Sequence, residues 1–196
     1  MMATSEGGGT RSKGFTLLGA LAFVEERYGE EARWKLLPEV DEESRQILTG
    51  PILPSGWYPF RAQVGLYEAI DRVFGAGDLA LCWEIGKFTC DYEMKSIHKV
   101  FLKLANLELW IRSSGLMWGR YYSDGRLEVE EIDASEGAIR IVDFKPLSKA
   151  FCYDFGGWLH RTLELNNRQS VEVEHSECVL DGAGACRYVG RWDRVA

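Results

Sequence analysis

The residues of this chain with the clearest potential for chemistry are three cysteines and a histidine in its C-terminal third. Seven residues lie between Cys178 and Cys186, and Cys152 lies further upstream. Three thiolates and one further donor complete a tetrahedral zinc shell. His175 precedes Cys178 by three residues, and a neutral imidazole nitrogen is a good zinc ligand. The residue types therefore allow a Cys3His zinc site.

The fourth ligand has two rivals, Glu174 and Glu177. Regular strand alternation puts Glu174 on the same face as Cys178 and places His175 on the opposite face. His175 can join the thiols only if the chain turns or bulges near Ser176. The thiols could also be small buried hydrophobic side chains, because the chain has no C-x2-C pair and the C-x7-C spacing is uncommon.

Two predicted hairpins and the helix between them have to bring these residues together. Apolar alternation predicts the strands, and turn residues at 135–137 and 181–184 predict the hairpins. Pro146 and Ser148 precede the predicted helix, which carries Cys152 near its start. In chain order the predicted elements are strands at 127–131 and 139–143, a helix at 149–165, and strands at 170–174 and 186–192.

The rest of the chain predicts a helical layer with one buried side. Asp41 is a plausible N-cap, and Pro51 to Pro59 form an irregular crossing segment. We therefore expect an α+β fold in which N-terminal helices pack on a four-stranded antiparallel sheet with a ββαββ ending. Residues 1–13 are expected to be a disordered tail, and 14–196 a single domain with a helical part at 14–122 and a sheet part at 123–196. The predicted helices span 14–28, 32–37, 42–48, 60–74, 78–92, 96–104 and 108–122.

Composition limits the classes of function. The 196 residues are 46% apolar and 27% charged, as in an ordinary soluble domain. The net charge of −7 disfavours nucleic acid as a partner, because phosphate binding needs a basic face. Five cysteines cannot all pair within one chain. The chain shows no export signal and no apolar run that could form a membrane span, so we expect a cytoplasmic protein with reduced thiols.

Aromatic residues are abundant, with seven tryptophans. They predict either a well-filled core with a dimer face or an apolar pocket between the helical layer and the sheet. Such a pocket would take an apolar or aromatic small molecule. The candidate pocket residues are Trp83, Trp110, Trp118, Tyr122, Phe144 and Phe155.

Other reactive residue types do not form a catalytic array. Cys152 and His160 lie on one predicted helix about 12 Å apart along its axis, which is beyond hydrogen-bond reach. His98 is a lone histidine, which argues against haem. Cys82 and Cys90 share a helix face and predict core packing. We therefore expect no enzymatic activity.

A resemblance adds to this interpretation. The segments Phe151-Cys152, Gly156-Gly157-Trp158, 171–178 and Gly182-x-x-x-Cys186-x-Tyr188 resemble the 4-vinyl-reductase-type ligand-binding domain. That family is related to the haem-NO-binding domain and to transport-particle (TRAPP) subunits. The whole chain is also similar to a group of myxobacterial paralogues of unassigned role, which share the element at 57–59.

The resemblance implies a zinc-stabilised domain that binds a small molecule or regulates a protein partner. Sensory members hold zinc with three cysteines and a carboxylate, and the carboxylate falls where this chain has His175. Relatives dimerise through N-terminal helices, so a homodimer is expected. The haem-binding branch has a Y-x-S-x-R motif, which this chain matches only at Tyr121 and Ser123, with Arg126 one place late. The alternatives are a scaffold subunit with a vestigial pocket and, third, an enzyme of tetrapyrrole or aromatic metabolism.

Overall fold

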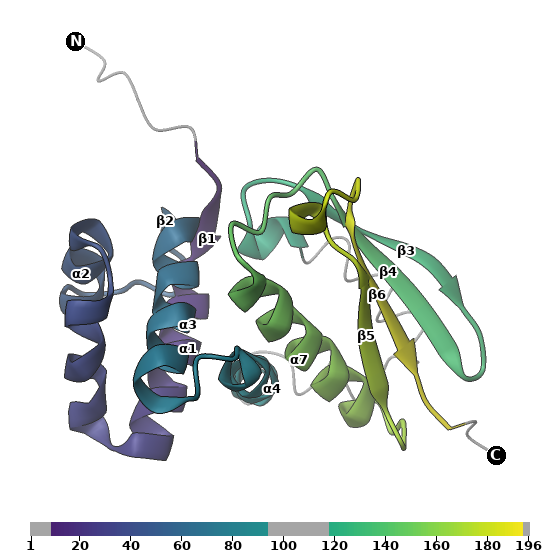
Figure 1. Cartoon of the computed structure of the whole chain (residues 1–196), viewed down its shortest axis with the longest axis horizontal. Helices are drawn as coiled ribbons and strands as arrows, with labels where there is room; N and C mark the ends of the chain where they lie inside the picture. The colour runs from purple at the N-terminus through teal and green to yellow at the C-terminus, as the bar shows by residue number, and fades with distance from the viewer. Residues whose placement is uncertain (1–8, 94–117, 194–196) are drawn as a thin grey trace, which may run out of the picture.

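The computed structural model describes residues 9–93 and 118–193, without the side chain of Glu131. Two units lie side by side, a helical unit and a sheet unit, and α4 and α7 pack against each other between them (Figure 1). The helical unit contains β1 (Arg11–Lys13), α1 (Gly14–Tyr28), the 3-10 helix η1 (Glu30–Glu39), α2 (Glu42–Thr49), β2 (Trp57–Pro59), α3 (Phe60–Phe74) and α4 (Ala80–Glu93). The sheet unit contains β3 (Arg126–Ile132), β4 (Glu136–Val142), α7 (Lys149–Leu165), β5 (Glu172–Glu177), the 3-10 turn η3 (Val179–Asp181) and β6 (Cys186–Arg191).

Local capping explains where the helices begin. Asp41 caps α2, because its Oδ1 accepts a hydrogen bond from the backbone N–H of Ser44 at 2.8 Å. Asp78 accepts one from Ala80 at the start of α4. The predicted helices at 14–28 and 60–74 are confirmed with the same bounds. The segment predicted at 32–37 is part of the longer 3-10 helix η1. The predicted helix at 96–104 and residues 108–117 of the last one lie outside the described residues.

The N-terminal segment corrects the predicted tail. Residues 11–13 form β1, which pairs antiparallel with β2 in the register Arg11 to Pro59 and Lys13 to Trp57. Ser12 is fully buried, and the Lys13 ammonium lies 3.8 Å from the centre of the Trp57 ring. A disordered tail through residue 13 is therefore wrong at its C-terminal end, because the Trp57–Pro59 segment supplies a pairing partner far along the chain.

The sheet unit confirms an α+β fold with a four-stranded antiparallel sheet in the order β3-β4-β6-β5. β5 is longer at its C-terminal end than the predicted strand at 170–174. Its pairing with β6 shifts register between His175 and Glu177, which leaves Ser176 as an extra residue. Among the described residues no helix is long and apolar enough to cross a membrane.

Glycines let α4 and α7 approach backbone to backbone. A Cβ added to Gly86 would collide with the Asp154 carbonyl of α7, and one added to Gly157 would collide with the Trp83 carbonyl of α4. Ser148 starts α7, because its Oγ accepts a hydrogen bond from the backbone N–H of Ala150 at 3.0 Å. This crossing fixes α7 against the helical unit, while its other side covers the sheet (Figure 1).

Candidate metal centre

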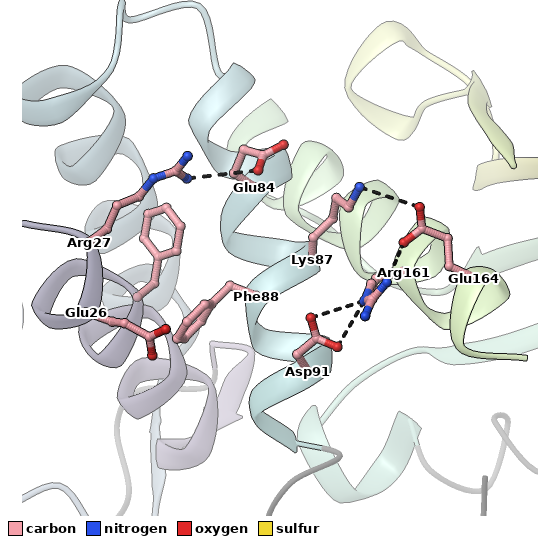
Figure 2. Close-up of a pocket in the computed structure, with 9 residues that line it drawn as sticks. Glu26, Arg27, Glu84, Lys87, Phe88, Asp91, Arg161 and Glu164 are labelled. Carbon is pink, nitrogen blue, oxygen red and sulfur yellow. Dashed lines mark hydrogen bonds and ion pairs between the residues drawn. The ribbon is translucent and has the colours of Figure 1, made fainter. Parts of the chain in front are cut away.

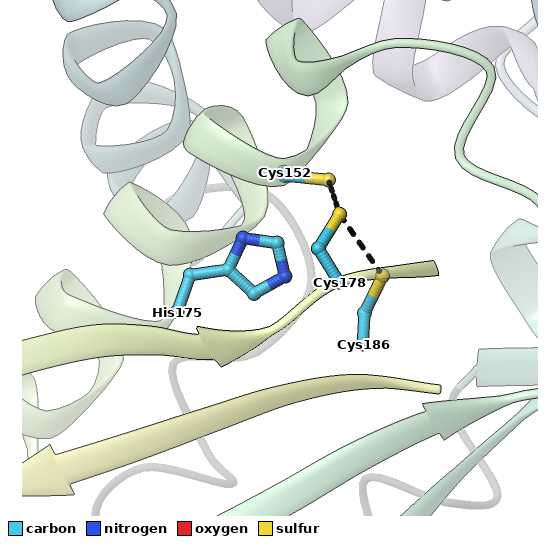
Figure 3. A group of neighbouring side chains, drawn as sticks. All are labelled: Cys152, His175, Cys178 and Cys186. Atoms are coloured by element: carbon cyan, nitrogen blue, oxygen red, sulfur yellow. Dashed lines mark hydrogen bonds between the residues drawn. The ribbon is translucent and has the colours of Figure 1, made fainter. Parts of the chain in front are cut away.

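The structure brings Cys152, His175, Cys178 and Cys186 into one cluster (Figure 3). One donor atom from each residue lies within 4.8 Å of all the others. The Cys178 sulfur is 4.0 Å from the Cys152 sulfur and 4.0 Å from the Cys186 sulfur. Zinc–thiolate bonds of about 2.3 Å in a tetrahedron place sulfurs about 3.8 Å apart. The spacing fits a tetrahedral ion and is too long for a disulfide, and all five cysteines are free.

Three elements position the thiols. Cys152 lies in the first turn of α7, Cys178 follows β5, and Cys186 begins β6. Between the last two, η3 reverses the chain, and Gly182 adopts a left-handed conformation at φ 92°. An ion pair between Lys149 and Asp181 fastens this loop to the start of α7. The loop between the strands thus lies against the helix that carries the first cysteine.

The bulge in β5 decides which residue is the fourth donor. His175 pairs with Tyr188, and their rings stack at 4.3 Å between centroids and 6° between planes. Because of the extra residue at Ser176, His175 and Cys178 lie on the same side of the sheet. The Nε2 atom of His175 is buried and has no nitrogen or oxygen hydrogen-bond partner in the described part of the chain. Such an atom fits a metal ligand.

The two carboxylate rivals point elsewhere. Glu174 is exposed and lies 3.0 Å from Arg191, and Glu177 is also exposed. The Tyr188 hydroxyl donates a hydrogen bond to the Cys152 carbonyl at 3.2 Å, so the ring that supports His175 is itself tied to α7. The bulge that the sequence analysis required for His175 is therefore present.

Cys152 and Cys186 shift each other's pKa in opposite directions. Hydrogen bonding from Cys152 lowers the pKa of Cys186 to about 4, with a further contribution from His175 and against the effect of burial. The same interaction with Cys186, together with burial, raises the pKa of Cys152. Cys152, Cys178 and Cys186 are all at most 4% exposed. A buried thiolate beside an imidazole is a suitable environment for a soft cation.

Four of the six predicted pocket residues lie together, and their rings pack on one another. The Trp118 ring lies 4.5 Å from Tyr122, 5.0 Å from Phe144 and 6.0 Å from Phe155. Trp83 lies apart, on α4, with its ring 5.9 Å from His160. Trp110 lies outside the described residues. These side chains form an aromatic core in the described part of the chain.

Sequence reasoning missed a chain of buried polar side chains. Thr16 of α1 donates to Gln63 of α3 at 3.0 Å, and Gln63 donates to the hydroxyls of Tyr67 at 2.9 Å and Tyr122 at 3.3 Å. The Tyr67 hydroxyl in turn hydrogen-bonds to Asp154 of α7, and burial raises the pKa of Asp154. The signal in the sequence was Gln63, a polar residue among the apolar residues of α3.

A second buried carboxyl lies further along α4. Glu93 accepts a hydrogen bond from the Trp158 indole at 3.2 Å. Burial raises the pKa of Glu93 to about 8, and the Trp158 hydrogen bond opposes that rise. Cys82 and Cys90 are fully buried and make helix-core contacts, as predicted.

A groove of about 560 Å³ lies between α1, α4 and α7 (Figure 2). Its acidic and basic side chains largely neutralise one another. Phe23 and Phe88 supply the apolar part of the lining. The ion pairs in the groove are Arg27–Glu84, Lys87–Glu164, Arg161–Asp91 and Arg161–Glu164.

Comparisons with solved structures identify the fold. An H-NOX protein from S. oneidensis in the Fe(II)NO ligation state has a TM-score of 0.70 at 13% identity, covering 93% of this chain and 99% of that one. The Fe(II) unliganded H-NOX protein from K. algicida has a TM-score of 0.69 at 16% identity, covering 93% and 97%. The chain therefore has the H-NOX fold. No protein-family model and no curated protein sequence matches it.

These neighbours correct the expectation against haem. A further similar structure, with a TM-score of 0.62 at 12% identity over 92% of this chain and 99% of that one, concerns haem redox potential and porphyrin distortion. That neighbour of the same fold carries haem, so the mismatch at Arg126 does not exclude haem. Of the described histidines, His160 Nδ1 lies 3.5 Å from Glu164 and His175 joins the thiols. The third histidine, His98, lies outside the described residues.

Proposed function

We propose that this chain is a non-enzymatic, ligand-sensing regulatory domain that is stabilised by zinc and signals through a protein partner. The observation that carries the zinc assignment is the convergence of three sulfurs and one buried imidazole within 4.8 Å. The H-NOX fold supports the sensing role, since neighbours with that fold are described in NO-ligated and unliganded iron states.

The cysteine cluster would hold the metal through Cys152, Cys178, Cys186 and His175. When bound, zinc would supply a cross-link between α7 and the β5–β6 hairpin. A complete four-ligand shell leaves no open position for substrate, so the site is structural. Tyr188 orients the imidazole by stacking, and its hydrogen bond to Cys152 fixes the distance between helix and strand.

Native mass spectrometry of the full chain purified from cells tests this proposal. We expect one zinc ion per chain and a retained non-protein mass, in a homodimer. The absorbance spectrum of the same sample identifies that mass as haem if a Soret band is present. A folded chain that carries neither metal nor any small molecule would contradict both parts of the proposal.

The packed aromatic core favours a second candidate, a scaffold subunit whose pocket is filled. The Trp118 ring lies within 6.0 Å, centre to centre, of the rings of Tyr122, Phe144 and Phe155. A zinc-loaded dimer with no retained small molecule that forms a stable complex with a partner protein would favour this candidate.

A further inference from the structure

The groove between α1, α4 and α7 is lined by side chains from all three helices (Figure 2). The lining residues of α1 are Phe23, Glu26 and Arg27, which lie on one face of the helix because they are three and four residues apart. Phe88 lies on α4, and its ring is 5.5 Å from the Phe23 ring. With a volume of about 560 Å³, the groove has room for a long side chain and part of its neighbours.

The charges that line this groove do not fully balance. Its three basic side chains, Arg27, Lys87 and Arg161, lie 3.9, 3.8 and 2.9 Å from a carboxylate. Four acidic side chains line the groove, and Glu26 is the one that makes no ion pair or hydrogen bond with the described residues. In Figure 2 the Glu26 carboxylate points into the groove, and no dashed line reaches it. The lining therefore has one negative charge in excess, which one cation would complement.

Aromatic surface near Glu26 limits the kind of cation. The half-buried Phe88 ring lines the same groove. The Tyr28 ring lies 6.4 Å from the Phe23 ring and is 37% exposed, so apolar surface continues beside the charged lining. A guanidinium pairs with a carboxylate through two hydrogen bonds and stacks on aromatic faces, whereas a Lys ammonium is a strongly hydrated point charge. An arginine with apolar neighbours therefore fits this surface best.

We propose that the groove is the docking site for an arginine side chain of a partner protein, which pairs with Glu26 and lies against Phe88. This inference rests on the proposed signalling through a protein partner and names the surface that the partner contacts. Because α1 and α4 belong to the helical unit and α7 to the sheet unit, the docked partner contacts both units. A change in how the two units pack would then change the affinity for the partner.

NMR titration of the full-length protein with short peptides tests the docking site. The probe is acetyl-Leu-Arg-Leu-amide, and its matched control carries neutral citrulline in place of arginine. We expect the arginine peptide to bind in a saturable manner and to shift the amide signals of Glu26 and Phe88. The citrulline peptide should bind about fivefold more weakly, because it lacks the charge that pairs with Glu26. Acetyl-arginine amide should also bind more weakly, because it lacks the apolar neighbours.

Variants locate the binding. Glu26→Gln should weaken binding of the arginine peptide by about fivefold and leave binding of the citrulline peptide unchanged. Phe88→Leu keeps an apolar side chain but removes the ring, and it should weaken binding by about twofold. Glu172→Gln, at an exposed acid of β5, is the charge-matched control and should leave Kd unchanged.

Several results would overturn the inference. They are no saturable binding of the arginine peptide, equal binding of the citrulline peptide, and an unchanged Kd in Glu26→Gln. Acetyl-arginine amide that binds as tightly as the peptide would make a small molecule the occupant. Self-association that is lost in Glu26→Gln, without peptide binding, would make a second copy of the chain the occupant.

Native mass spectrometry tests the other parts of the proposed function separately. Zinc and a retained small molecule in a protein that ignores the arginine peptide would reject the docking site alone. A protein that carries no small molecule but binds the peptide would support the docking site and count against the sensing role.

Discussion

The helical unit and the sheet unit have cores of different chemistry. The core of the helical unit is largely aliphatic, with Leu17, Leu66, Ile70 and Ile85 fully buried. The core under the sheet combines aromatic rings with the thiols of the cysteine cluster. The four strands of the sheet are six or seven residues long, which is an ordinary strand length. The proposed zinc site would give the sheet unit a cross-link, whereas the core of the helical unit relies on packing.

Removing one thiol of the cluster should have the largest effect. Cys186→Ser is expected to lower the free energy of unfolding by at least about 4 kcal/mol, because loss of a structural metal is among the most damaging changes. Urea unfolding followed by circular dichroism measures this, with zinc content determined in parallel. Cys82→Ser, at a buried thiol of the helical unit, is the control and should retain zinc. If both variants unfold alike and a chelator leaves the wild type unchanged, the cluster is not a metal site.

Adding a methyl group between α4 and α7 should separate the two units. Gly157→Ala would push a Cβ against the Trp83 carbonyl, and we expect a loss of about 3 kcal/mol. Gly65→Ala in α3 is the matched control, since an added Cβ there meets nothing within 4 Å. That control should gain up to about 1 kcal/mol from helix propensity. Equal stability of the two variants would contradict the close backbone contact between α4 and α7.

The buried acid of α4 should make the helical unit sensitive to pH. The pKa of Glu93 is raised from 4.5 to about 8 by burial, so the folded state holds a proton that the unfolded state loses. The contribution of Glu93 to stability is therefore fully present below about pH 4.5 and is lost towards pH 8, by up to about 1.4 kcal/mol per pH unit. Glu93→Gln should flatten this slope, and Asp91→Asn should preserve it. Chemical unfolding of the wild type and both variants at several pH values between 5 and 8 measures this slope.

Loosening the loop between β5 and β6 should have the smallest effect. Asp181→Asn removes the ion pair with Lys149, which is partly exposed and is worth about 1 kcal/mol or less. Its sharper readout is the rate of zinc transfer to a chelator, which should rise. Glu39→Gln removes a comparable exposed pair with Arg72 in the helical unit and should leave that rate unchanged.

The sequence predicted helices well where local signals mark their ends. Asp41 and Ser148 act as caps, and Pro59 precedes α3, so these boundaries could be placed from residue types. The strand β1 was missed because three residues carry no alternation of their own and pair with Trp57–Pro59, which lies far along the chain.

The residues of the cysteine cluster could be predicted from the sequence, but the choice of its fourth member could not. Thiol spacing located Cys152, Cys178 and Cys186, yet alternation alone favoured Glu174. Only the bulge at Ser176 turns His175 inward, and a bulge depends on pairing with β6 rather than on local sequence. Asp154 was overlooked because its neighbours in α7 are apolar and the residue type is ordinarily exposed.

The bulge in β5 also affects how the molecule behaves in concentrated solution. β5 is an edge strand of the described sheet, and an uninterrupted edge is a template for pairing with the same strand of another copy. The extra residue at Ser176 interrupts the regular row of outward N–H and C=O groups. The bulge that brings the His175 imidazole to the thiols thereby also protects the chain against edge-to-edge pairing of β5 with another copy.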